Sequence, residues 1–130
     1  MKILDNLLYS KNDEWVKIEG KTAVIGLTDY AQSQLSDIVY SEICVSAGDD
    51  LQAEDTIATV ESVKAAADVY TPVAGKVAEI NDTVVDTPDL INKDPFGDAW
   101  LVKIENASGF ATGDLMDANA YKTFCEGREK

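Results

Sequence analysis

Lys64 is the residue whose type and position most clearly allow chemistry. It lies in the segment 60–66, VESVKAA, between two stretches with strand character. A lysine at a tight turn between strands extends from the body of the protein on a long aliphatic stem, and the small residues at 65–67 leave its flank open. This arrangement suits modification of the side chain by an enzyme that encloses it. On these features alone, the alternative is an ordinary solvated turn lysine.

The composition excludes several classes of reactive site. The chain has no histidine, so it cannot build a Ser-His-Asp or Cys-His nucleophile system or a histidine-ligated metal centre. Its two cysteines, Cys44 and Cys125, are too few for a four-cysteine zinc site or an iron–sulfur cluster. We expect both to be free thiols of a reducing compartment, packed as small buried apolar residues.

Length and charge limit the domain count and the partners. The 130 residues match the commonest domain size, and we expect one domain over residues 1–130. The 24 acidic and 11 basic residues give a net charge of -13, which argues against nucleic acid and anionic membrane surfaces as partners. A protein partner with a basic docking face would suit the chain better. The N-terminus does not resemble a signal peptide, so we expect a cytoplasmic protein, with the mitochondrial matrix as the alternative for a processed form.

Short strands separated by turns dominate the chain. Period-two alternation and β-forming residues predict a hairpin over 14–27 with its turn at Gly20, and strands over 37–45, 56–60, 65–70, 76–80 and 100–104. Many short strands with turn signals between them indicate an all-β protein. Trp15, Tyr70 and Trp100 fall in strand contexts, so we expect them to pack in the core or at its rim.

Three helical segments are predicted beside these strands. The first covers 28–35 with Thr28 as its N-cap, and the second is one turn at 87–91 with Thr87 as cap and Pro88 at the first helical position, followed by a loop over 92–97. The third follows Asp117 as its N-cap and ends at Gly127.

Several ordered blocks of the sequence are similar to one known family. They include EWV at 14–16, TDYAQ at 28–32, ESVKA at 61–65, YTPVAGKV at 70–77 and LINKDPFG at 90–97. In this order and at this spacing, over about residues 9–126, the chain resembles the glycine cleavage system H protein family. It departs from the family pattern at Asp13, where histidine is usual, at Ser36, where glycine is common, and in the turns near 42–48 and 54–55.

The resemblance implies a fold and a role. The fold is an all-β, flattened barrel-sandwich hybrid of two small antiparallel sheets, with short flanking helices and a C-terminal helix. The role is that of a carrier protein rather than an enzyme, with lipoate attached through an amide to Lys64 by a lipoate ligase or an octanoyl transferase. In this family the arm takes the aminomethyl group of glycine from a pyridoxal-phosphate glycine decarboxylase to an aminomethyltransferase, and dihydrolipoamide dehydrogenase reoxidises it.

The resemblance also implies roles for three acidic residues. We expect Glu14 and Asp68 to line a cleft that receives the loaded arm, and Glu61 to contact the modifying enzyme. The alternative for all three is an ordinary polar or solvated position. We expect a monomer that forms transient complexes with the three enzymes.

Other interpretations of Lys64 remain open. A lipoyl domain of a 2-oxo-acid dehydrogenase and a biotinyl carrier use a lysine on a similar hairpin. An H-protein-like chain could instead act as a lipoate depot that hands lipoyl groups to other apoproteins. A binding module in which Lys64 is never modified is a further alternative.

Overall fold

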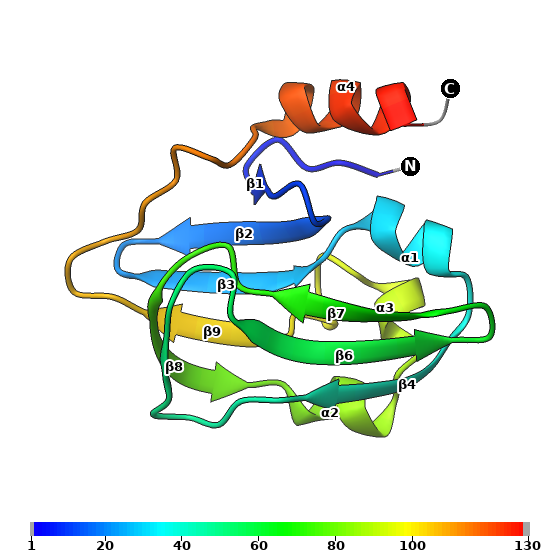
Figure 1. The fold of residues 1–130 in the computed structure, drawn as a ribbon, viewed down its shortest axis with the longest axis horizontal. Helices are drawn as coiled ribbons and strands as arrows, with labels where there is room; N and C mark the ends of the chain where they lie inside the picture. The colour runs from blue at the N-terminus through cyan, green and yellow to red at the C-terminus, as the bar shows by residue number, and fades with distance from the viewer. Residues whose placement is uncertain (1, 129–130) are drawn as a thin grey trace.

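The computed structural model describes residues 2–128 and consists mainly of short strands (Figure 1). The strands are β1 (Leu8–Tyr9), β2 (Glu14–Glu19), β3 (Thr22–Leu27), β4 (Ile38–Ile43), β5 (Asp50–Leu51), β6 (Thr56–Ser62), β7 (Ala66–Tyr70), β8 (Gly75–Ile80) and β9 (Val102–Glu105). The helices are α1 (Asp29–Leu35), α2 (Asp82–Asp86), α3 (Leu90–Lys93) and α4 (Ala118–Arg128).

The strands form two antiparallel sheets. The larger has the order β1-β2-β3-β9-β8-β5, and the smaller has the order β4-β6-β7. The hairpin of β2 and β3 pairs Val16 with Ile25 and turns at Gly20, whose φ of 63° favours a residue without a Cβ. The two-sheet all-β architecture with short helices confirms the fold class expected from the resemblance.

Apolar side chains from both sheets form the main core. The larger sheet contributes residues such as Ile25 and Ile104, and the smaller sheet contributes Ile57, Val60 and Val69, all fully buried. Each such side chain stabilises the fold by about 1.5–3 kcal/mol relative to an exposed position. This core therefore fixes the β6–β7 hairpin, which carries Lys64, against the rest of the molecule.

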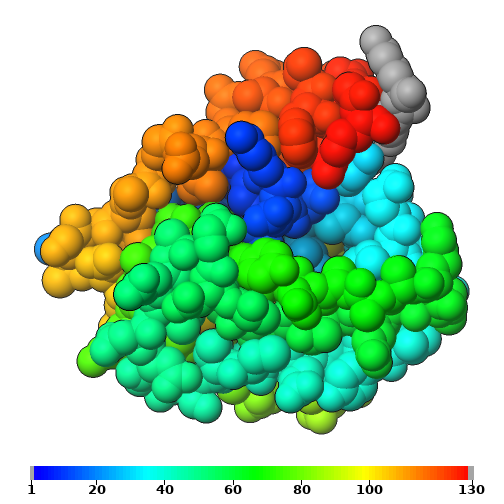
Figure 2. Space-filling view, viewed as in Figure 1, coloured from blue at the N-terminus to red at the C-terminus, as the bar shows by residue number. Residues whose placement is uncertain are grey.

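A second cluster joins the two ends of the chain. Figures 1 and 2 show α4 lying beside the N-terminal segment. The rings of Tyr9 and Tyr121 stack with centroids 4.6 Å apart, and Trp15 and Cys125 are buried in the same cluster. The predicted N-cap of α4 is confirmed, because Asp117 Oδ1 accepts a hydrogen bond from Ala120 N at 2.8 Å.

The first two helices show where capping signals succeed and where they were missed. The cap of α1 is confirmed, because the Thr28 hydroxyl accepts from Ala31 N at 3.1 Å. Helix α2 was not predicted, although Asn81 caps it by accepting from Thr83 N. Its five residues include Val84 as the one buried side chain, too little for a helical period to be visible.

Three helix boundaries differ from those predicted. The helical turn expected at Thr87–Pro88 begins instead at Leu90, after a turn closed by Leu90 N donating to Thr87 O. It then continues to Lys93, into the expected loop. Gly127 does not end the C-terminal helix, which continues to Arg128, where the side chain packs over the rings of Tyr30 and Phe124.

Candidate functional site

Lys64 lies at the tip of the β6–β7 hairpin, as predicted. The pairing of Glu61 with Ala66 leaves a short connection, Ser62–Ala65, which we call the Lys64 turn. The Ser62 hydroxyl accepts from Lys64 N at 3.2 Å and from Ala65 N at 3.0 Å, while Ser62 N donates to Ala65 O at 2.7 Å. One serine side chain therefore fixes the turn locally, in the way serine hydroxyls commonly close turns.

The surroundings of the amine are open. Lys64, Ala65 and Ala66 are exposed, and the Val63 side chain is 68% exposed. The amine lies 3.4 Å from Gln34 O in the last turn of α1, a long and solvent-exposed contact. Figure 1 shows the hairpin turn at one edge of the molecule, beside the segment between α1 and β4. An enzyme can therefore reach the amine without displacing core residues.

Glu14 occupies a very different position, at the start of β2. It is 1% exposed, and both carboxylate oxygens have partners: Ser10 Oγ donates to Oε1 at 2.5 Å, and Tyr70 N donates to Oε2 at 3.1 Å. Burial raises the pKa of Glu14 from 4.5 to about 7, although these hydrogen bonds favour the charged form. We call this region, Ser10–Glu14 with Tyr70, the Glu14 corner.

Asp68 and Glu61 both lie on the exposed surface of the smaller sheet. Asp68 is on β7, four residues beyond Lys64, and its Oδ1 accepts from Thr59 Oγ1 at 3.2 Å. Its position two residues before Tyr70 directs both side chains to the same face of the strand. Glu61 is opposite Ala66 and Tyr40 in the ladders on its two sides. Lys64, Asp68 and Tyr70 therefore follow one another along the β6–β7 hairpin, with Glu61 beside the lysine, and Glu14 meets this hairpin from β2 at Tyr70.

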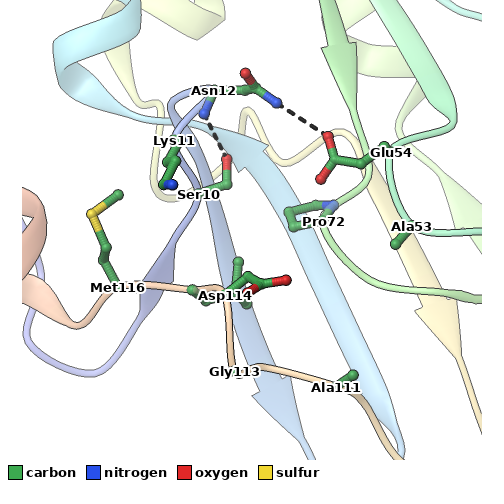
Figure 3. Close-up of a pocket in the computed structure, with 11 residues that line it drawn as sticks. Ser10, Lys11, Asn12, Ala53, Glu54, Pro72, Ala111, Gly113, Asp114 and Met116 are labelled. Carbon is green, nitrogen blue, oxygen red and sulfur yellow. Dashed lines mark hydrogen bonds between the residues drawn. The ribbon is translucent and has the colours of Figure 1, made fainter.

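The Glu14 corner also borders a cavity of about 860 Å³. Its lining includes Ser10, Asn12, Glu54 and Pro72 together with the 111–116 segment (Figure 3). Asn12 Nδ2 donates to Glu54 Oε2 at 3.2 Å across one side, and Asn12 N donates to Ser10 Oγ at 3.2 Å. Ser10 thus connects the cavity wall to the Glu14 carboxylate. Ser10 was not predicted from the sequence, where its one weak signal is a polar run directly before β2.

Asp13, the residue directly before Glu14, anchors α4. Its φ is 67°, and its carboxylate accepts from Tyr121 Oη at 2.9 Å and from both terminal nitrogens of Arg128, at 2.6 and 3.1 Å. Hydrogen bonding to Asp13 raises the pKa of Arg128 above its ordinary value. This pairing holds the turn that precedes Glu14 against the C-terminal helix.

The remaining predicted residues have simple positions. Trp15 is buried in the core, and Tyr70 and Trp100 are half-buried at its rim, as predicted. Cys125 is buried, but the prediction of a buried Cys44 is wrong, because that side chain points outward just past the end of β4, 3.8 Å from Thr59 Oγ1. Within residues 2–128, no three His, Cys, Asp or Glu side chains gather in a group that could hold a metal ion.

Comparison with known proteins agrees with this geometry. A model of the family described as glycine cleavage H-protein matches residues 7–128. The glycine cleavage system H protein of Thermoanaerobacter sp. (strain X514) is 50% identical over 126 residues, covering 97% of this chain and 98% of the relative. That of Bacteroides thetaiotaomicron is 43% identical over 127 residues, covering 98% of this chain and 100% of the relative.

A solved structure supports the same assignment. The crystal structure of a glycine cleavage system H protein from Mycobacterium marinum superposes with a TM-score of 0.83 at 29% sequence identity. The match covers 93% of this chain and 97% of that chain. By family match, by close relatives along nearly its whole length and by fold, the chain belongs to the glycine cleavage H-protein family.

Proposed function

We propose that this chain is the lipoylated carrier of a glycine cleavage system, with lipoate joined through an amide to Lys64. The observation that carries this proposal is an exposed lysine at the tip of a hairpin whose strands are fixed by the core. The lipoyl group, when attached, supplies a dithiolane that can accept the aminomethyl group of glycine together with two electrons. The protein presents this group and does not itself make or break those bonds.

Attachment requires only that a modifying enzyme reach the turn. A lipoate ligase would activate lipoate with ATP, releasing pyrophosphate, and the Lys64 amine would displace AMP from the acyl adenylate to form the amide. An amine attacks an acyl group only through its free nitrogen lone pair, so the enzyme has to present Lys64 in its neutral form. An octanoyl transferase could supply the acyl group by the alternative route. Glu61, exposed three residues before Lys64, is our proposed contact for either enzyme.

The geometry also supports a docking place for the arm. The four residue steps from Lys64 to Asp68 would span about 13 Å if fully extended, a length comparable to a lysine stem with an eight-carbon acyl chain. Asp68 offers an exposed carboxylate along this path, and Glu14 offers a buried one beside Tyr70. We propose that both help hold the cationic end of a loaded arm, because a cation near Glu14 favours the charged carboxylate and exclusion of water protects a labile group.

The proposed partners follow from the family. They are the glycine decarboxylase, the aminomethyltransferase and dihydrolipoamide dehydrogenase, each meeting a monomeric carrier in a transient complex. The net charge of -13 would speed encounters with basic docking faces more than it would tighten the complexes. None of the helices described for residues 2–128 is long and apolar enough to cross a membrane. We propose the cytoplasm as the compartment.

The test is glycine-dependent exchange of labelled bicarbonate into glycine by a glycine decarboxylase supplied with the lipoylated chain. We expect exchange to rise with carrier concentration and to be absent with Lys64→Arg treated in the same way. A lipoylated chain that supports no exchange with a decarboxylase active on another H protein would contradict the shuttle. If that same chain passed its lipoyl group to another apoprotein, the depot role would replace the shuttle.

A further inference from the structure

The Lys64 turn is held from outside the hairpin as well as from within. Val63 N, one residue before the lysine, donates to Asp37 O at 3.1 Å. Asp37 lies in the connection between α1 and β4, which passes beside the hairpin tip (Figure 1). The orientation of the turn therefore depends on where this connection places the Asp37 carbonyl.

The connection has an unfavourable backbone conformation. Ser36, the C-cap of α1, has φ 67° and ψ -149°. This part of the map is close to a region that glycine almost alone adopts, and a residue with a Cβ is kept there only when its surroundings hold it. Ser36 N donates to Gln32 O, which fixes one side of the residue. The other side needs a further support.

Asn92, on α3, supplies that support. Its Nδ2 donates to Ser36 O at 2.8 Å and to Gln32 Oε1 at 2.9 Å, and its Oδ1 accepts from Ile38 N at 2.8 Å. One side chain thus binds the backbone on both sides of Asp37. Its amide makes both donor contacts and one acceptor contact, which together fix its orientation.

We propose that Asn92 is a positioning residue for Lys64, acting through Asp37 and Val63 to hold the lysine turn in the orientation that a modifying enzyme recognises. Asn92 does not touch the lysine or any group attached to it. Its contribution is to keep a strained connection in place, so that the Asp37 carbonyl meets Val63 N. The consequence for lipoylation rests on the proposed function, whereas the effect on the turn does not.

Asn81 provides a matched control elsewhere in the fold. Its Nδ2 donates to Asp98 O at 2.8 Å and to Trp100 O at 2.6 Å, and its Oδ1 accepts from Thr83 N at 3.2 Å. Like Asn92, Asn81 therefore makes two donor contacts and one acceptor contact, but it joins the start of α2 to the segment before β9. A general loss of stability should appear in variants of both residues, and a loss of turn orientation only in variants of Asn92.

The first test is hydrogen exchange of the Val63 amide, followed by NMR on the unmodified chain. We expect Asn92→Ala to speed exchange at Val63 about tenfold relative to the wild type, since loss of the side chain releases both anchors of the connection. Asn81→Ala should leave Val63 exchange unchanged after correction for global stability. Asn92→Asp, which keeps the acceptor for Ile38 N, should give a smaller increase. Equal Val63 exchange in the Asn92→Ala and Asn81→Ala variants would overturn the proposal.

The second test separates this inference from the proposed function. With a lipoate ligase, Asn92→Ala should raise the KM for the carrier several-fold with little change in kcat, while Asn81→Ala keeps the wild-type KM. Adding Ser36→Gly should restore part of the lost affinity for the ligase, because glycine adopts the strained conformation without the hydrogen bonds from Asn92. An unchanged KM in Asn92→Ala, or no recovery with Ser36→Gly, would refute the positioning role. Absence of lipoylation in the wild type would instead refute the proposed function. Hydrogen exchange at Val63 would still test whether Asn92 holds the Lys64 turn.

Discussion

The Lys64 turn and the Glu14 corner lie at opposite ends of the β6–β7 hairpin: Lys64 is at its tip, and Glu14, on β2, meets its far end at Tyr70. At the turn, Lys64 and its neighbours are exposed, and a single serine hydroxyl and one carbonyl from outside hold the backbone. At the corner, Glu14 is 1% exposed, both of its oxygens are hydrogen-bonded, and its pKa is raised by burial to about 7. The first is built for access and the second for exclusion of water.

This difference matches what a carrier of a labile group needs. A group must be attached and collected where enzymes can reach it, and it must be protected while it travels. Buried carboxylates interact more strongly with a cation than exposed ones, because solvent screens them less. Substitutions at the corner should therefore have large effects on the stability of the fold and on the protection of the loaded arm. Substitutions at the turn should have small effects on stability.

The largest effect should come from Glu14→Gln and should depend on pH. The folded-state pKa of about 7 lies above the ordinary 4.5, so the native state holds a proton that the unfolded state has released. Wild-type stability therefore falls as pH rises from about 4.5 through 7, by about 3 kcal/mol from this group. Glutamine cannot ionise, so the free energy of unfolding of the variant should lack this decrease. Between pH 4.5 and 7 the difference between the two proteins should shift in favour of the variant by up to about 3 kcal/mol, as measured by urea unfolding.

Asp68→Asn is the matched control for that pH series. Asp68 is exposed on β7, so Asp68→Asn shows what the removal of one surface charge does to the free energy of unfolding over the same pH range. A difference between Glu14→Gln and the wild type that does not change with pH would show that the corner is not dry and would remove the contrast between the two regions.

The next effect should come from packing beside the corner, between β2 and β3. A Cβ on Gly26 would lie 2.7 Å from the indole of Trp15, which follows Glu14 and donates from Nε1 to Pro95 O at 2.8 Å. We expect Gly26→Ala to reduce the free energy of unfolding by about 2 kcal/mol through overpacking. Gly113→Ala, where an added Cβ meets nothing within 4 Å, is the control. Equal stabilities for the two variants would mean that the core beside the corner tolerates an added methyl group.

Protection of the loaded arm should distinguish the two carboxylates. With aminomethyl-loaded carrier and no enzymes present, Glu14→Gln should speed decay of the loaded arm about tenfold, the loss of one buried charge-assisted contact. Asp68→Asn should speed it about twofold or less, because exposed ion pairs contribute little. Release of formaldehyde measures the decay. Wild-type decay rates in both variants would refute the docking proposal.

The smallest effect should be at the turn itself. Val63 is 68% exposed, so Val63→Ser should change the free energy of unfolding by less than about 0.5 kcal/mol. Thermal unfolding of Val63→Ser and Gly26→Ala under the same conditions compares the two losses of stability directly. A loss comparable to that of Gly26→Ala would show that the turn is part of the cooperative core and not a separate presentation element.

The sequence predicted the parts of the fold that depend on local pattern. The hairpin at Gly20, the strands on both sides of Lys64 and the caps Thr28 and Asp117 all follow from periodicity or capping chemistry, and all are confirmed. Helix α2 was missed because it buries one side chain, and Gly127 was misassigned because a glycine near a helix end does not by itself stop the helix when Arg128 packs on α4 and α1.

The candidate site divides in the same way, into features set by local sequence and features set by contacts between distant residues. The exposure of Lys64 could be predicted because a turn between two strands is a local feature. The burial of Glu14 could not, since it depends on Tyr70, which is 56 residues away in the chain. Asn92 likewise binds Ser36 and Ile38 across more than 50 residues, and nothing in its local sequence signals this role. Long-range hydrogen bonds of this kind require the tertiary structure.

The most direct test of the account is the intact mass of the chain after incubation with lipoate, ATP and a lipoate ligase, beside Lys64→Arg. The account predicts the mass of one lipoyl group added to the wild type, mapped to the peptide containing Lys64, and none added to the variant. Equal modification of both proteins, or no modification of folded wild type by a ligase active on another carrier, would contradict it.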